Sequence, residues 1–323
     1  MNRRRLLRAL PLASLAFLPG LSRSQSYPGR PVLLLVGAPP GAVPDLLARP
    51  VAERLSALLG QPVVVENRPG AGGALSMTAL ARSAPDGYTL ALATMSQAVF
   101  NPYLFAKLGY DPLRDLEPVA PLVTGSMALA AHPSFPARTL PEFIALAKAR
   151  PGTLFVAIPQ LGAPPHIVAL LLNRVAGIDV TLVPHKSGAD AMNAVISGQI
   201  PLLLDAPTIM VGPIQAGRLK VLAVTGRQRE PTLPDTPTAA ESGINLDGEA
   251  WIGLVAPKGT PPAVVQRLNR DLATVMGSPD MRNLMARVGF RTLSSTPDEF
   301  RALIRDEHTK WGPAIKEAGL SLE

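Results

Sequence analysis

The sequence predicts an α/β protein of two lobes, each with a mainly parallel sheet flanked by helices and joined to the other by crossover strands. Short apolar runs typical of buried strands alternate with segments of helical periodicity, first from residue 31 and again from residue 140. The pattern changes at residues 227–237, which are rich in proline and charge. The 323 residues also exceed what one hydrophobic core usually serves.

The first α/β unit opens with a continuous apolar run at residues 31–36, which Gly37 ends, as expected of a strand buried on both faces. Apolar residues then recur at helical spacing from Leu46 to Leu59, and Gly60 closes this helix. A strand, a glycine-rich turn, a helix and a further strand follow, at residues 63–66, 70–73, 75–83 and 89–93. This order predicts a βαβαβ unit with parallel strands.

The second unit repeats the alternation of helices and strands. Helices are predicted at residues 140–149, 165–176, 189–197 and 207–216. Strands are predicted at residues 154–158, 180–183, 200–204 and 219–224. Two such units predict two sheets.

The C-terminal part is predicted to return to the first lobe. Residues 251–256 resemble a crossing strand, and 261–276 form an amphipathic helix. Two further helices, 297–306 and 310–318, carry apolar stripes that need a surface to cover. We therefore predict lobe 1 at 27–127 and 247–323 and lobe 2 at 128–246, with a cleft at the carboxyl ends of the strands, where open α/β sheets bind ligands.

The N-terminus has the pattern of an export signal. Arg3, Arg4, Arg5 and Arg8 precede an apolar stretch at residues 9–18, which is too short to span a bilayer. Small residues predict cleavage near residues 24–26, so that 1–26 would be removed. The arginines also resemble a twin-arginine signal, and both that route and the general secretory route stay open. Either route predicts a periplasmic protein.

Charge and composition exclude several functions. Residues 1–26 hold five arginines and no acids, so the net charge of +7 falls to +2 without them, which argues against nucleic-acid binding. The sequence has no cysteine, so disulfides and thiolate chemistry are excluded. His166 and His185 are too isolated in the sequence to predict a metal site, and we expect neither metal nor cofactor.

Five sequence motifs, in order and at consistent spacing, resemble those of the tripartite tricarboxylate transporter receptors, the Bug or TctC-like solute-binding proteins. They are VGAPPGAVPD at 36–45, VENRPGAGG at 65–73, APDGYT at 84–89, LPDTPT at 233–238 and GLVAPKGTP at 253–261. The resemblance implies a type II periplasmic-binding-protein fold, or Venus flytrap, with no cofactor and no catalysis. It further implies an organic carboxylate as ligand, a monomeric receptor and the membrane subunits of a tripartite transporter as partners.

Backbone amides at the starts of helices are the groups that we expect to hold the carboxylate, since they carry unpaired N–H groups and partial positive charge. In lobe 1 the candidates lie in two turns between a strand and a helix, at Pro40, Gly41, Ala42 and Gly73. Small residues there let a ligand approach the backbone. The alternative interpretation is that both segments are only tight turns.

In lobe 2 the corresponding turns contain Gln160, Gly162, Ala163 and Ser187. The family that the sequence resembles has a loop rich in hydroxyl groups at this place, whereas residues 158–165 of this sequence are IPQLGAPP. The prolines also remove backbone N–H donors. In the first lobe Ala38 stands where the family often has an aromatic residue. These departures favour a wider, more apolar pocket and a larger or less charged acid.

Other polar residues fit either a binding or a structural role. Thr94, Ser96 and Gln97 follow the third strand and are candidate donors to a ligand or caps of a helix. Asp205, at the end of a strand, is a candidate for binding a ligand amine or a water, or for a turn. Asp45 is expected to stabilise a helix start rather than to bind an anion.

The sequence contains none of the common catalytic signatures. It has no G-x-S-x-G, no H-E-x-x-H, no phosphate-binding G-x-x-x-x-G-K and no G-x-G-x-x-G. We therefore predict a receptor and not an enzyme. A second reading, a periplasmic ligand-sensing co-receptor for a signalling system, needs the same cleft and stays open.

Overall fold

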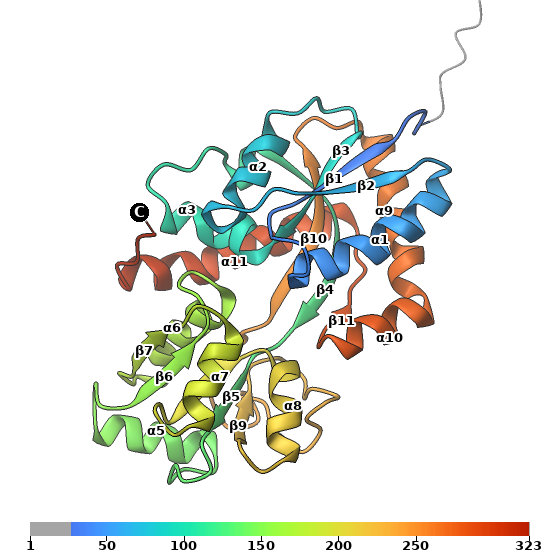
Figure 1. Cartoon of the computed structure of the whole chain (residues 1–323). Coiled ribbons are helices and arrows are strands. Elements are labelled where there is room, and N and C mark those ends of the chain that lie inside the picture. Colours follow the sequence, from blue (N-terminus) through green and yellow to red (C-terminus); the bar gives the residue numbers. More distant parts are fainter. Residues whose placement is uncertain (1–26, 323) are drawn as a thin grey trace, which may run out of the picture.

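The computed structural model describes residues 27–322, so the predicted export signal at 1–26 lies outside the described residues. The first sheet has six strands in the order β11-β4-β10-β3-β1-β2 (Figure 1). The strands are β1 (Val32–Val36), β2 (Val63–Asn67), β3 (Thr89–Thr94), β4 (Leu116–Gly125), β10 (Ala250–Pro257) and β11 (Arg291–Thr292). Strand β1 pairs in parallel with β2 and β3, while β10 runs antiparallel between β3 and β4.

Helices cover both faces of this sheet. The longer ones are α1 (Val43–Leu59), α2 (Ala74–Ala81), α9 (Pro262–Gly277), α10 (Pro279–Arg287) and α11 (Pro297–Glu317). Short helical segments are η1 (Ala71–Gly73), η2 (Ser96–Phe100), α3 (Asn101–Leu104) and α4 (Pro112–Asp115). Leu34 and Val36 of β1 pack into the cluster formed with α1 and α9, while Leu35 packs into the cluster on the opposite face. The continuous apolar run of β1 therefore reflects burial on both faces.

The second sheet has five strands in the order β7-β6-β8-β5-β9. They are β5 (Ala128–Ala131), β6 (Phe155–Ile158), β7 (Thr181–Pro184), β8 (Leu202–Asp205) and β9 (Lys220–Val224). The helices of this lobe are α5 (Leu140–Ala149), α6 (Pro164–Ala176), α7 (Gly188–Ile196) and α8 (Pro207–Gln215). Each predicted helix and strand of this unit is present, with its bounds shifted by at most two residues.

Two segments connect the sheets. The chain passes from β4 to β5 through residues 126–127 and returns from β9 to β10 through residues 225–249 (Figure 1). We call these the outward and the return crossover. This division between the sheets supports the lobe boundaries after residues 127 and 246, which we retain as a proposal.

The predicted two-lobed α/β architecture is present, and most strands of each sheet run in one direction. In each sheet a crossover strand, β10 or β5, is antiparallel to both of its neighbours. The reason is topological: one segment must carry the chain out to lobe 2 and another must bring it back, so the strands attached to them run in opposite directions.

No strand or helix was predicted within residues 94–139 and 277–296, where the structure has β4, β5, α10 and β11 among other elements. Strand β4 contains Pro118 and Pro121, which disfavour a central strand, yet both face register irregularities in β10 where the regular hydrogen-bond ladder is interrupted. Helix α10 and strand β11 were also not predicted. The two helices expected at 297–306 and 310–318 are one continuous helix, α11, which contains Pro313.

Gly253 in β10 is a position where the fold needs the absence of a side chain. A Cβ there would overlap the ring of Phe300 and lie 2.8 Å from the carbonyl oxygen of Ala120. We expect Gly253→Ala to destabilise the protein by about 1–3 kcal/mol through overpacking, as measured by denaturant unfolding. The matched control is Gly212→Ala in α8, where a Cβ meets nothing within 4 Å. There we expect stabilisation of about 0.5–1 kcal/mol, and an equal effect of the two changes would contradict the packing argument.

Candidate functional site

A cavity of about 790 Å³ lies between the lobes and is lined by residues from both. Most of the residues predicted to bind a ligand line it: Ala42, Gly73, Thr94, Ser96, Gln97, Gln160, Gly162, Ala163, Ser187 and Asp205. The cavity lies at the starts of α1, α6, α7 and α8, as expected from the carboxyl ends of the strands. Pro40 and Gly41 are exposed residues outside its lining.

The turn before α1 is held by a buried carboxylate. Asp45 is 2% exposed and accepts hydrogen bonds from the amide of Gly41 at 2.9 Å, from Arg49 and from Asn67. Burial opposes its ionisation, but the bonds from Arg49, Gly41 and Asn67 outweigh burial and lower the pKa of Asp45 to about 2. The amide of Gly41 is therefore committed within the protein and not directed at a ligand. Asp45 stabilises the helix start, as expected.

Gln97 forms part of the cavity floor and is itself packed between two glycines. A Cβ on either Gly37 or Gly73 would overlap its side-chain amide. The Gln97 side-chain oxygen accepts the backbone N–H of Thr94 at 2.8 Å, and the amide of Gly73 bonds to the carbonyl of Gly70. The two glycines are thus required by close packing of Gln97, and the geometry favours the structural alternative for Gly73 and Gln97.

The loop before α6 is stabilised by a neutral histidine. His166 is 3% exposed, and its Nδ1 accepts the amide N–H of Gly162 at 3.0 Å. Burial lowers the pKa of His166 to about 4, which keeps Nδ1 free to accept. The amide of Ala163 bonds to the carbonyl of Gln160. Across the cleft, the Ser96 hydroxyl donates to the carbonyl of Gly162 at 3.4 Å, so this loop touches lobe 1.

The start of α7 lies beside a buried carboxylate. Ser187 caps this helix, since its hydroxyl oxygen accepts the amide of Asp190 at 3.2 Å. Asp205 is 8% exposed, and its Oδ1 accepts the amide of Ala206 at 2.7 Å. A Cβ on Gly188 would overlap Oδ2 of Asp205, so the two residues are in close contact. Burial raises the pKa of Asp205 to about 6, and no described cation offsets it.

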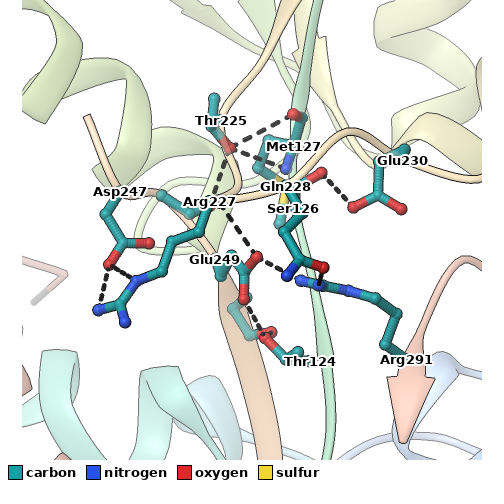
Figure 2. A network of polar contacts seen from close by, with 12 residues as sticks. Thr124, Ser126, Met127, Thr225, Arg227, Gln228, Glu230, Asp247, Glu249 and Arg291 are labelled. Carbon is teal, nitrogen blue, oxygen red and sulfur yellow. Dashed lines mark hydrogen bonds and ion pairs between the residues drawn. The ribbon is translucent and has the colours of Figure 1, made fainter. Parts of the chain in front are cut away.

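Polar contacts connect the two crossovers to each other (Figure 2). The hydroxyl of Thr225 accepts the amide of Met127 at 2.9 Å and donates to the carbonyl of Gly248 at 2.9 Å. Glu249 in the return crossover accepts the hydroxyl of Thr124 at 3.1 Å and also binds the guanidinium of Arg291. The outward and return segments are therefore bound to each other and to β11.

Residues 47–320 match the family model described as the tripartite tricarboxylate transporter family receptor. The chain belongs to this family. It is 33% identical to the protein BugT of Bordetella pertussis over 93% of each chain. Among solved structures, R. palustris Rpa4515 with adipate is 30% identical with a TM-score of 0.78, covering 92% of this chain and all of the other. MatC from Rhodopseudomonas palustris with bound malate is 32% identical with a TM-score of 0.74, covering 90% and all, respectively.

These likenesses confirm the predicted type II periplasmic-binding-protein fold of this receptor. Within residues 27–322 no helix is long and apolar enough to cross a membrane. The same residues contain no group of three histidine, aspartate or glutamate side chains placed to hold a metal ion.

Sequence reasoning missed the part of the receptor's cavity that comes from the crossovers and the C-terminal region. Met127, Val288, Phe290 and Leu322 line it, and Trp251, expected to be a packed residue, both lines the cavity and packs edge-on against Phe300. Met127 belongs to the outward crossover, and Val288 and Phe290 follow α10, a helix that was not predicted. Their apolar character is the only feature that could have marked them.

The buried His166 predicts an acid-sensitive stability for the receptor. Between its native pKa of about 4 and its ordinary value of 6.5, the unfolded chain binds the proton and the native state does not, so stability rises with pH in that window. In His166→Asn, the Asn oxygen can accept the Gly162 amide without titrating. We expect the loss of stability from pH 6.5 to pH 4.5 to shrink by roughly 2 kcal/mol in this variant, as measured by denaturant unfolding.

Asp205 affects the pH dependence of stability in the opposite direction to His166. Its pKa is raised to about 6 from an ordinary 3.8, so the native state binds the extra proton and stability falls as pH rises through that interval. This contribution is common to both proteins and cancels in their comparison. An unchanged pH dependence in His166→Asn would contradict the assigned neutral His166.

Proposed function

We propose that the protein is a periplasmic receptor that captures a small organic carboxylate in the inter-lobe cleft. It delivers this ligand to the membrane subunits of a tripartite tricarboxylate transporter and does no chemistry on it. The observation that carries the proposal is the cavity of about 790 Å³, into which helix starts of both lobes open. The volume falls in the range usual for small-molecule sites.

Backbone amides at the starts of two helices are free donors at the cavity. Val43 is the first residue of α1, and Gly188 is the first of α7, and both line the cavity. The first N–H groups of a helix have no intrahelical acceptor and carry part of the positive end of the helix dipole. Because α1 belongs to lobe 1 and α7 to lobe 2, an anion between them would bind both lobes.

Contacts across the cleft support closure around the ligand. Ser96 of lobe 1 bonds to the Gly162 loop of lobe 2, and a Cβ on Gly289 of lobe 1 would overlap Thr208 of lobe 2. A ligand that contacts both lobes only in the closed form would shift the population toward that form.

The comparisons support the carboxylate, the partner and the compartment. One relative is described with adipate and one with malate, and both of these ligands are carboxylic acids. The family description names a tripartite transporter, which supports membrane subunits as partners. A relative 34% identical is described as the periplasmic binding protein BugD, in agreement with an export signal at residues 1–26.

A negative charge at the start of α1 should compete with the ligand. Ala42 is the N-cap of α1 and lines the cavity, so Ala42→Glu places a carboxylate where we expect the ligand anion. A carboxylate suits a helix start, so the fold should be kept. We expect calorimetric titration to show binding of carboxylic acids weakened at least about tenfold, or ~1.4 kcal/mol.

The control is Ala145→Glu on the exposed face of α5, which adds the same charge away from the cavity. It should bind as the unchanged protein does. Equal binding by Ala42→Glu and the unchanged protein would place the ligand elsewhere. Mass spectrometry of the ligand after long incubation should recover it unaltered, and conversion to a product would reject the receptor proposal.

A further inference from the structure

The polar side chains of the cavity are largely committed to bonds within the protein. Gln97 accepts the amide of Thr94, and Asn101 donates to the carbonyl of Gly72 at 3.3 Å. Ser126 donates to Glu230 at 2.6 Å, and Ser187 donates to Asp190 at 2.8 Å. The side-chain N–H donors left are few, chiefly Nε2 of Gln97 and Nε1 of Trp251, which is buried without a hydrogen-bond partner, so little is available to replace the hydration of a second anionic group on the ligand.

The charged groups of the cavity do not favour a polyanion either. Among the described residues that line it, Lys186 is the one basic residue and Asp205 the one acidic residue. Lys186 is exposed, while Asp205 is buried beside the start of α7. Since these two charges cancel, the lining has no net positive charge to balance a second ligand carboxylate, and an unbalanced buried charge is costly. The arrangement suits a ligand with a single carboxylate.

The remaining wall is apolar and comes from segments that meet only in the folded protein. Its larger side chains are Met127, Trp251, Ile252, Val288, Phe290 and Leu322. A ligand that touched only the helix starts would leave this surface without a partner. An apolar ligand body would cover it, which is favourable in proportion to the area removed from water.

Phe290, one of these lining residues, packs against the end of a strand. A Cβ on Gly125 would lie 3.1 Å from Cδ1 and 3.2 Å from Cε1 of Phe290, so the ring packs on the end of β4, next to the outward crossover. On the adjoining residue, a Cβ on Gly289 would overlap Thr208 of α8. The turn at 288–290 therefore extends from lobe 1 to lobe 2 and closes one side of the cavity with an aromatic ring.

We propose that the cleft selects monocarboxylates with a bulky apolar body, such as an aromatic or alicyclic ring, and that Phe290 sets this preference. The inference rests on the proposed function, since it names the ligand class of the same cleft. It separates this receptor from relatives described with adipate and malate, which carry two carboxyl groups.

The test is calorimetric titration of the purified chain with two sets of acids. One set is benzoate, cyclohexanecarboxylate and 3-phenylpropanoate; the other is succinate, adipate and malate. We expect at least one ring acid to bind about tenfold or more tighter than every dicarboxylate. Tighter binding of a dicarboxylate would overturn the ligand class and leave the proposed function intact. Absence of binding by all six acids would count against both.

The residue assignment is tested by Phe290→Ala, Phe290→Leu and a control, Val175→Ala. Val175 is an exposed apolar residue of α6 outside the cavity lining. Phe290→Ala should weaken ring acids by about tenfold or more, because a hydrophobic contact of this size contributes that much discrimination, and Phe290→Leu should restore part of it. Val175→Ala should change nothing. If both Phe290 variants bound ring acids as tightly as the unchanged protein, the role assigned to Phe290 would be wrong. If Phe290→Ala does not fold, the affinity of Phe290→Leu alone decides the question.

Discussion

The relative placement of the lobes depends on the hydroxyl of Thr225, the first residue of the return crossover. This hydroxyl bonds to backbone groups of both crossovers at the same point. It accepts the amide of Met127 in the outward segment and donates to the carbonyl of Gly248 in the return segment. Met127 and Gly248 are both buried, so without Thr225 the N–H of Met127 and the carbonyl of Gly248 would lack hydrogen-bond partners. Glu249 and Arg291 extend the network to β11 (Figure 2). The two bound segments thus form a single connection between the lobes, which we call the hinge.

The hinge also determines how the helix starts of the two lobes are placed relative to each other. The cavity is bounded by α1 from one lobe and α7 from the other, and their relative position is set by the crossovers and by the 288–290 turn. That turn leads directly into Arg291, whose guanidinium bonds to Glu249 and to Gln228 of the return crossover. The residue that we assign to ligand selection therefore adjoins the residue that anchors the hinge, and a change in one is expected to be felt by the other.

Sequence patterns predicted the two α/β units and ten of the residues that line the cavity, because both follow from local rules. A buried parallel strand reads as an apolar run, and a ligand site follows where such strands end. Strand β4, which leads into the outward crossover, was missed because it contains Pro118 and Pro121, whose bulged positions depend on pairing with β10. Likewise, nothing local indicates that His166 accepts the amide of Gly162 four residues earlier, or that Asp45 uses the amide of Gly41. Such pairings require the loop conformation that they stabilise.

Those internal pairings also explain why the cleft would favour an apolar acid with one carboxylate. Pro164 and Pro165 remove two donors from the first turn of α6, and His166 occupies the amide of Gly162. On the other lobe, Asp45 occupies the amide of Gly41. Each of these features withdraws a donor that a second carboxylate would need, while leaving the helix starts that hold the first. Specificity of this kind arises because a dicarboxylate finds no donors for its second carboxylate. An unpaired buried charge costs more free energy than one added contact contributes.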